Sequence, residues 1–159
     1  MSENIQQLVE TLAGQLSARN AMLTCAESCT GGWIAKVLTD RAGSSAWFDR
    51  GFVTYSNRAK QEMLGVAATT LATQGAVSRD TVLEMARGAL ANSGAQYAVS
   101  VSGVAGPGGG TLEKPVGTVW IAWAGNGFAD TACEHFDGDR EAVRLATVKT
   151  ALAGLVARL

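Results

Sequence analysis

The 159-residue sequence predicts an α/β fold, a three-layer α/β/α sandwich with a mixed, mostly parallel sheet and an antiparallel edge hairpin. Segments with apolar residues at helical spacing alternate with short apolar, β-branched runs. This order is typical of a largely parallel sheet covered by helices on both faces. Near the C-terminal end, two apolar runs are separated only by Gly125-Asn126-Gly127, which is typical of a hairpin turn.

The N-terminal half predicts alternating helices and strands. Five apolar residues recur at helical spacing in the first twenty positions and predict an amphipathic helix over 3–19. Asn57 is expected to cap the helix of residues 57–64, and Gly65 to end it. The other elements expected in this half are a strand over 21–25, a helix over 31–40, a strand over 51–55 and a short helix over 69–74.

The C-terminal half predicts the remaining strands. Ser78 is a suitable N-cap for a helix that extends to about Asn92. Apolar and β-branched composition predicts strands, and glycine-rich composition predicts a loop between them. The elements expected are a strand over 96–102, a loop over 103–115, strands over 116–124 and 128–136, and a final helix over 139–159.

Length and charge limit the classes of protein. A chain of 159 residues is typical of one domain, so we expect a single domain over residues 1–159. The 13 Lys+Arg and 14 Asp+Glu residues nearly balance, which leaves no basic face for nucleic acid, and we expect no nucleic-acid partner. Charged residues make up only 17%, which leaves room for apolar subunit contacts through Trp47, Trp120 or Trp123. We therefore expect a homo-oligomer.

The chain ends and cysteines predict a location and a redox state. The N-terminus has no basic region followed by an apolar run, and no uncharged apolar stretch is long enough to span a bilayer. We therefore expect a cytoplasmic protein without membrane contact. Cys25, Cys29 and Cys133 are expected to be reduced thiols. With His135 as the only histidine, the spacing does not suit a zinc site, and we expect no metal and no cofactor.

The first candidate site segment follows the first expected strand. Ligands of open α/β sheets bind at the carboxyl ends of strands. Here Ser28, Cys29 and Thr30 precede Gly31 and Gly32 at the start of a helix, where backbone N–H groups can bind an anion or a developing oxyanion. Ser28 is placed as a nucleophile beside these donors, and Cys29 is an alternative nucleophile. In the structural interpretation, Ser28 and Thr30 only cap the helix.

A serine nucleophile needs a base, and the second segment offers one. His135 lies within an expected strand and is a poor candidate, whereas Lys60 lies in the first turn of an expected helix. The positive end of the helix dipole disfavours an ammonium there, which lowers the pKa in the direction that a base needs. Tyr55 could relay a proton or fix the lysine. The alternatives are a solvated helix lysine and an aromatic residue packed in the core.

The third segment is a glycine-rich loop that includes Gly103, Ala105 and Gly106. It lacks the Gly-Lys-Ser/Thr ending of a P-loop and the fingerprint of a dinucleotide-binding loop, which disfavours an ATPase or a dinucleotide-dependent oxidoreductase. Arg140 and Arg144 open the last helix four residues apart and could contact a phosphate from one face. Alternatively, they belong to a surface charge cluster.

Six motifs in this order resemble the CinA C-terminal domain family, which includes stand-alone nicotinamide mononucleotide deamidases. The resemblance covers nearly the whole chain. The motifs are Ala26-Glu27-Ser28-Cys29-Thr30-Gly31-Gly32, Gly51-x-Val53-x-Tyr55-Ser56-Asn57-x-x-Lys60, Gly75-Ala76-Val77-Ser78, Ser102-Gly103-x-Ala105-Gly106-Pro107, Lys114-Pro115-Val116-Gly117-Thr118-Val119 and Gly138-Asp139-Arg140.

The resemblance implies hydrolysis of the carboxamide of nicotinamide mononucleotide to nicotinic acid mononucleotide and ammonia, in the recycling of pyridine nucleotides. It implies a serine–lysine mechanism without metal, in which Ser28 matches the nucleophile, Lys60 the base and Tyr55 their neighbour. The loop of residues 103–110 and the two arginines would then bind the 5′-phosphate. Two alternatives stay open: a serine or cysteine amidase with a different substrate, and a nucleotide-binding regulatory module without catalysis.

Overall fold

The computed structural model describes residues 2–159, whose strands form one mixed five-stranded sheet in the order β2-β1-β3-β4-β5. The strands are β1 (Leu23–Glu27), β2 (Phe48–Val53), β3 (Tyr97–Gly103), β4 (Thr118–Gly125) and β5 (Phe128–His135). β1 pairs in parallel with β2 and β3, whereas β4 pairs antiparallel with β3 and β5. The mixed sheet and the edge hairpin are confirmed, and parallel pairing is confined to β2, β1 and β3.

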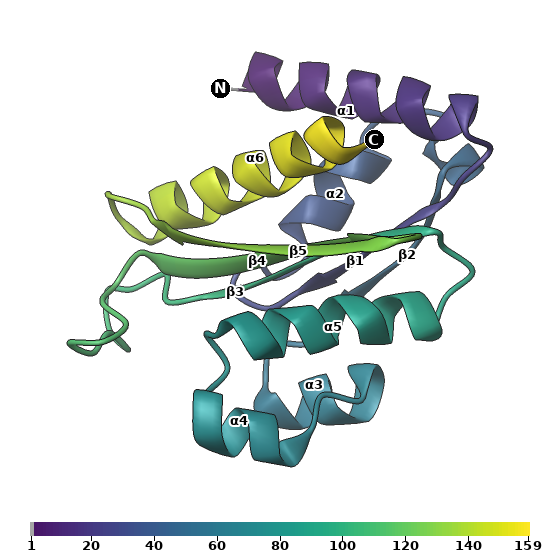
Figure 1. Cartoon of the computed structure of the whole chain (residues 1–159). Coiled ribbons are helices and arrows are strands. Elements are labelled where there is room, and N and C mark those ends of the chain that lie inside the picture. Colours follow the sequence, from purple (N-terminus) through teal and green to yellow (C-terminus); the bar gives the residue numbers. More distant parts are fainter. Residues whose placement is uncertain (1) are drawn as a thin grey trace.

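Helices cover both faces of this sheet, which confirms the predicted three-layer sandwich (Figure 1). One face carries α1, α2 and α6, and the other carries α5, with α3 and α4 packed outside it. A 3-10 turn, η1 (Ser44–Ala46), precedes β2. Within residues 2–159, no helix is long and apolar enough to cross a membrane. The helices are α1 (Ser2–Ala18), α2 (Trp33–Thr39), α3 (Asn57–Leu64), α4 (Ala68–Gln74), α5 (Arg79–Ala91) and α6 (Arg140–Arg158).

The two faces of the sheet carry side chains of different size. Leu23, Val99 and Ile121 pack beneath α1, α2 and α6. On the α5 side, the central strands present mainly alanine, including Ala26 and Ala122. Small side chains let a helix approach a sheet closely, so α5 packs tightly on the strands that end at the candidate site.

The parallel strands bring the candidate segments to one edge. Glu27, the last residue of β1, lies in register with Val53 of β2 and Val101 of β3. The chain therefore leaves all three strands at the same edge of the sheet. Two backbone hydrogen bonds continue this arrangement, from the Thr54 amide to the Glu27 carbonyl and from the Ser28 amide to the Val101 carbonyl.

Several element boundaries differ from the prediction. β4 begins at Thr118 rather than at residue 116, because Gly117 adopts φ +96° and a Cβ there would lie 2.1 Å from the Phe136 carbonyl oxygen. α2 begins at Trp33 rather than at residue 31, because the two preceding glycines have positive φ. The N-cap of α3 is Ser56 rather than Asn57, since the Ser56 hydroxyl accepts from the Ala59 amide.

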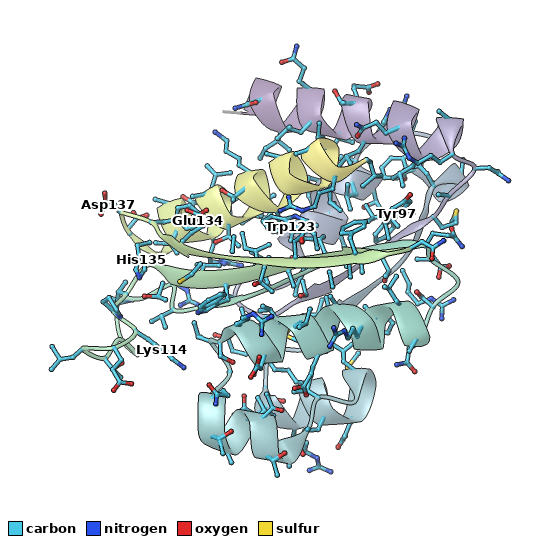
Figure 2. All side chains as sticks on the ribbon, viewed as in Figure 1. Tyr97, Lys114, Trp123, Glu134, His135 and Asp137 are labelled. Carbon is cyan, nitrogen blue, oxygen red and sulfur yellow. The ribbon has the colours of Figure 1, made fainter. Side chains whose placement is uncertain are left out.

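Two of the tryptophans that we expected at a subunit contact lie in the core. Trp47 is 1% exposed and Trp123 is 3% exposed. The Trp123 indole lies between the sheet and α6, where its N–H donates to the Ala151 carbonyl at 2.9 Å (Figure 2). The expectation that Trp47 or Trp123 mediates subunit contacts is therefore wrong, because apolar character alone does not distinguish a core position from an interface.

Candidate active site

Ser28 and Lys60 meet at the carboxyl edge of the sheet. Ser28 directly follows β1, and Lys60 lies in the first turn of α3, thirty-two residues further along the chain. The Lys60 Nζ atom lies 2.9 Å from the Ser28 Oγ atom. Both side chains are buried, at 1% and 7% exposure. A nucleophile and a base at this separation can exchange a proton directly.

The remaining partners of Lys60 are backbone carbonyls, not carboxylates. Its Nζ atom donates to the Thr54 carbonyl at 2.9 Å and to the Tyr55 carbonyl at 3.1 Å. Burial disfavours the ammonium form and lowers the Lys60 pKa to about 8. A neutral amine has two N–H groups and one lone pair. If the two carbonyls accept the N–H groups, the lone pair faces the Ser28 hydroxyl and can accept its proton.

Glu27 is a residue of the site that the sequence analysis did not single out. Its carboxylate is fully buried and accepts from the Ile34 amide at 2.9 Å and the Ala35 amide at 3.0 Å. The Thr30 hydroxyl also donates to it, at 2.5 Å. The negative charge thus binds the N-terminal amides of α2 from within the protein. The only sequence signal was a glutamate at the end of an otherwise apolar segment, directly before the candidate nucleophile, and its backbone partners leave no signature there.

This contact changes which amides could stabilise an oxyanion. The sequence left all the N–H groups over residues 29–32 as candidates. The Gly31 amide, however, donates to the Ser28 carbonyl at 3.1 Å, and Glu27 binds the first amides of α2. Among residues 2–159, the amides of Cys29, Thr30 and Gly32 find no backbone acceptor. Cys29 lines the pocket beside Ser28 and Lys60, whereas Thr30 and Gly32 line a separate hollow, so the Cys29 amide is the donor that a substrate could use.

The Cys29 thiol differs from an activated nucleophile. Burial is the main cause that raises its pKa to about 11, and the Glu27 charge adds to this, while Arg144 and Lys60 act in the opposite direction. A thiol attacks as its thiolate, so a raised pKa lowers its reactivity near neutral pH. The environment therefore favours Ser28 over Cys29.

A pocket of about 240 Å³ opens onto the Ser28–Lys60 pair. It brings together seven of the residues predicted for the site, namely Ser28, Cys29, Tyr55, Lys60, Gly103, Ala105 and Arg140. Ser102 and the Ala76-Val77 segment complete the lining and were not predicted as site residues. The Gly75-Ala76-Val77-Ser78 motif was visible in the sequence, but its alanine and valine carry no chemistry that spacing could identify.

Tyr55, Gly106 and Arg140 form a group at the pocket mouth. The Tyr55 ring is 62% exposed, and its hydroxyl accepts from Arg140 Nη2 at 3.4 Å. Arg140 Nη1 donates to the Gly106 carbonyl at 2.8 Å. Tyr55 contacts Lys60 through its backbone carbonyl, while its side chain points to the arginine. The guanidinium thus lies at the entrance, where an anionic group of a ligand could meet it.

The other predicted binding residues lie away from this pocket. Thr30, Gly31, Gly32 and Arg144 line a separate, open hollow beside α2. Arg144 donates to the carbonyls of Cys29 and Thr30 at 3.0 and 3.1 Å, so its guanidinium binds the loop itself. The structure therefore separates the two arginines that the sequence placed together on one helix face.

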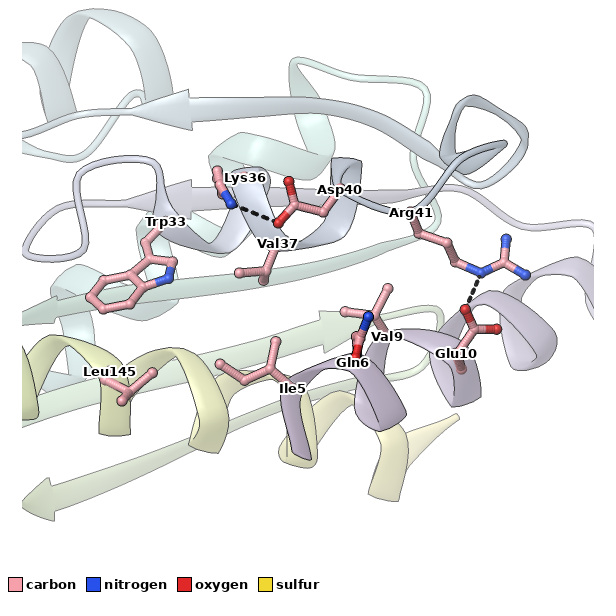
Figure 3. Close-up of a pocket in the computed structure, with 10 residues that line it drawn as sticks. All are labelled: Ile5, Gln6, Val9, Glu10, Trp33, Lys36, Val37, Asp40, Arg41 and Leu145. Carbon is pink, nitrogen blue, oxygen red and sulfur yellow. Dashed lines mark hydrogen bonds and ion pairs between the residues drawn. The ribbon is translucent and has the colours of Figure 1, made fainter. Parts of the chain in front are cut away.

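A larger hollow of about 630 Å³ lies between α1, α2 and α6 (Figure 3). Its lining includes the apolar side chains of Ile5, Val37 and Leu145. Two ion pairs, Lys36–Asp40 and Arg41–Glu10, also line it. It contains no serine and no thiol among its lining residues. Over residues 2–159, no three or more His, Cys, Asp or Glu side chains gather as a metal site would require.

Comparison with known proteins identifies the family. A family model described as "CinA C-terminal domain" matches residues 5–159. The chain belongs to the CinA C-terminal domain family. The family match covers every residue of the Ser28–Lys60 site, together with the loop and the final helix that border its pocket.

Several relatives match along nearly their full length. The chain is 59% identical over 152 residues to "Nicotinamide-nucleotide amidohydrolase PncC" of Escherichia coli strain K12, covering 95% of this chain and 92% of that one. It is 53% identical to the protein of the same name from Pseudomonas putida, covering 96% and 95%. The solved structure of competence/damage inducible protein CihA from Agrobacterium tumefaciens superposes with a TM-score of 0.94 at 52% identity, covering 97% and 94%.

Proposed function

We propose that this protein is a nicotinamide mononucleotide amidohydrolase, which converts the carboxamide of its substrate to a carboxylate and releases ammonia. The observation that carries the proposal is the buried contact between Lys60 Nζ and Ser28 Oγ, because the lysine has a lowered pKa and, within residues 2–159, its other partners are backbone carbonyls. The curated relatives that bear this activity in their names are more than half identical to the chain over almost its entire length.

In the acylation half of the proposed reaction, Ser28 Oγ attacks the carboxamide carbon while neutral Lys60 takes the hydroxyl proton. The carbonyl oxygen becomes an oxyanion that the amide of Cys29 stabilises. When the tetrahedral intermediate collapses, the carbon–nitrogen bond breaks and Lys60 gives its proton to the leaving nitrogen. Ammonia departs, and the nicotinate acyl group stays on Ser28 as an ester.

In the deacylation half, water attacks the ester carbon and Lys60 takes a proton from it. The carbon–oxygen bond to Ser28 breaks, Lys60 returns the proton to Ser28 Oγ, and the carboxylic acid product ionises in water. One water is consumed and one ammonia is formed for each substrate. Every proton passes through Lys60, so the reaction needs no metal and no cofactor.

Two parts of the pocket would bind the substrate. The apolar lining formed by Ala76, Val77 and Ala105 suits the flat pyridine ring. Arg140 lies at the mouth, where its guanidinium can bind the 5′-phosphate after exchanging its contact with Tyr55. The loop that contains Gly103 and Gly106 would border the ribose.

We also propose a cytoplasmic location and a homo-oligomeric state. The three cysteines are free thiols, which suits a reducing compartment. Met63, Leu112 and Val116 are large apolar side chains exposed outside the core, and they are the candidates for a subunit contact. Light scattering on the purified protein tests the assembly, and a monomer mass over the micromolar range would reject it.

An ammonia-release assay with purified protein and nicotinamide mononucleotide tests the proposed function. We expect stoichiometric ammonia and nicotinic acid mononucleotide from the wild type. Two comparison substrates are informative: nicotinamide riboside, which lacks the phosphate, and nicotinamide, which lacks the whole ribose phosphate. Binding of the nucleotide without any ammonia would instead favour a regulatory module, and turnover of unrelated amides at equal rates would favour a broader amidase.

A further inference from the structure

The turn that follows Ser28 is held by Arg144 of α6. The Arg144 Nε atom donates to the Cys29 carbonyl at 3.0 Å, and its Nη2 atom donates to the Thr30 carbonyl at 3.1 Å. The guanidinium also lies over the Trp33 ring, 5.7 Å from its centroid. These contacts fix the Arg144 side chain, and the fixed guanidinium holds two successive peptide groups in one orientation.

The orientation of these peptide groups places their amides. The Cys29–Thr30 and Thr30–Gly31 bonds are trans, so each N–H points opposite to the carbonyl of the same peptide group. Both carbonyls point at Arg144, and therefore the Thr30 and Gly31 amides point away from it. The Gly31 amide donates to the Ser28 carbonyl at 3.1 Å, which closes the turn directly after the nucleophile.

These peptide groups belong to the turn that carries the nucleophile. Cys29 directly follows Ser28, and its carbonyl accepts from Arg144. Cys29 lines the Ser28 pocket, whereas Thr30, which is fully buried, lines the hollow beside α2 together with Arg144. Arg144 therefore acts on the backbone next to the reacting centre without lining the Ser28 pocket.

We propose that Arg144 is a positioning residue for the turn that carries Ser28 and the Cys29 amide, acting through the carbonyls of Cys29 and Thr30, and that it does not bind the phosphate. This inference rests on the proposed function. Its location supports it, because Arg144 lines the hollow beside α2, whereas Arg140, one helical turn earlier, lines the Ser28 pocket. The two arginines therefore divide the tasks that one helix face suggested for both.

The test compares Arg144→Met with Arg140→Met in two measurements. Steady-state ammonia release gives kcat and KM for each variant. Titration calorimetry gives the Kd of nicotinamide mononucleotide for each variant in a Ser28→Ala background, where no turnover disturbs binding. For Arg144→Met we expect kcat to fall about 10²-fold, as for a small misplacement of catalytic groups, while Kd changes less than about threefold. For Arg140→Met we expect Kd to rise at least about tenfold, the loss of a charge-assisted hydrogen bond.

Two further results make the outcome decisive. Arg144→Lys keeps the charge but cannot donate to both carbonyls in the planar geometry of arginine, so its kcat should lie between those of Arg144→Met and the wild type. This variant also serves if Arg144→Met fails to fold. A Kd that rises in Arg144 variants with an unchanged kcat would overturn the positioning role and identify a phosphate ligand. A wild type that releases no ammonia would overturn the proposed function itself.

Discussion

The Nζ atom of Lys60 lies 2.9 Å from the Oγ atom of Ser28, and its other two partners are the carbonyls of Thr54 and Tyr55. The three partners match both protonation states of the amine. An ammonium donates to all three oxygens, whereas a neutral amine donates to the carbonyls and accepts from the serine. The site can thus change its protonation state without moving a heavy atom, which suits a group that takes and returns one proton in each half-reaction.

The activity should depend on the Lys60 pKa, which burial lowers to about 8. Only the neutral amine can accept the Ser28 proton, so kcat/KM should rise about tenfold per pH unit below pH 8 and level off above it. Measuring kcat/KM between pH 7 and 9.5 avoids the titration of the substrate phosphate near pH 6. A flat profile over this range would show that Lys60 is not the base.

Replacing Lys60 with methionine should abolish activity and relieve a pH-dependent loss of stability. The folded-state pKa of about 8 lies below the ordinary value of 10.5, so the unfolded chain binds the proton more tightly. Below pH 8, the lowered Lys60 pKa reduces the free energy of unfolding of the wild type by its full amount, and this reduction becomes small as the pH rises to 10.5. We expect the stability of the wild type relative to Lys60→Met to improve by about 3 kcal/mol between pH 7 and pH 10.5.

Urea unfolding of both proteins at pH 7, 9 and 10.5 measures this difference. Lys36→Met provides the matched control, because Lys36 is an exposed lysine in an i,i+4 pair with Asp40. Its effect should stay within about 0.5 kcal/mol across the same range. If the difference between wild type and Lys60→Met does not vary with pH, the amine is not held with a lowered pKa.

Glu27→Gln should weaken both the fold and catalysis. The carboxylate accepts from the amides of Ile34 and Ala35, and a glutamine would turn its own N–H₂ group toward one of these donors. We expect a loss of about 2–4 kcal/mol in the free energy of unfolding, since the affected groups are buried. The kcat should fall as well, because the turn after Ser28 loses its internal support.

Glu84 gives a matched comparison for Glu27. Its carboxylate also accepts from a backbone amide and a threonine hydroxyl, those of Ala67 and Thr70, but it is only half-buried and lies on α5 away from the pocket. Glu84→Gln should cost about 1 kcal/mol and leave kcat unchanged. Equal effects of the two substitutions on kcat would contradict a specific role for the Glu27 carboxylate.

The packing of α3 against α5 should depend on Gly88. A Cβ atom at this position would lie 1.9 Å from the Leu64 carbonyl oxygen, so Gly88→Ala should destabilise the protein by about 3 kcal/mol. Gly14 is also helical but has no atom within 4 Å of its missing Cβ, and Gly14→Ala should stabilise the protein by about 1 kcal/mol. Thermal unfolding of the two variants should shift the Tm in opposite directions, and shifts of the same sign would contradict this packing.

The sequence predicted the layers of the fold, and it predicted Ser28 and the helix of Lys60 at one edge of the sheet, because parallel strands end at one edge and both segments follow such ends. The directions of the side chains could not be predicted from the sequence. Arg140 and Arg144 differ in their tasks because their side chains, one helical turn apart on α6, line different hollows. Tyr55 lies two residues after the end of β2, and its side chain contacts Arg140 instead of Lys60. Glu27 was overlooked because its partners are backbone amides, which have no sequence signature.

Ammonia release by three proteins side by side, the wild type, Ser28→Ala and Cys29→Ala, tests the identity of the nucleophile most directly. The account predicts that Ser28→Ala loses at least about 10⁴-fold in kcat, as when a member of a catalytic unit is removed. The kcat of Cys29→Ala should stay within about tenfold of the wild type, because the thiol that this change removes has a pKa raised to about 11. Retained activity in Ser28→Ala, together with its loss in Cys29→Ala, would contradict the serine–lysine mechanism and make the thiol the nucleophile.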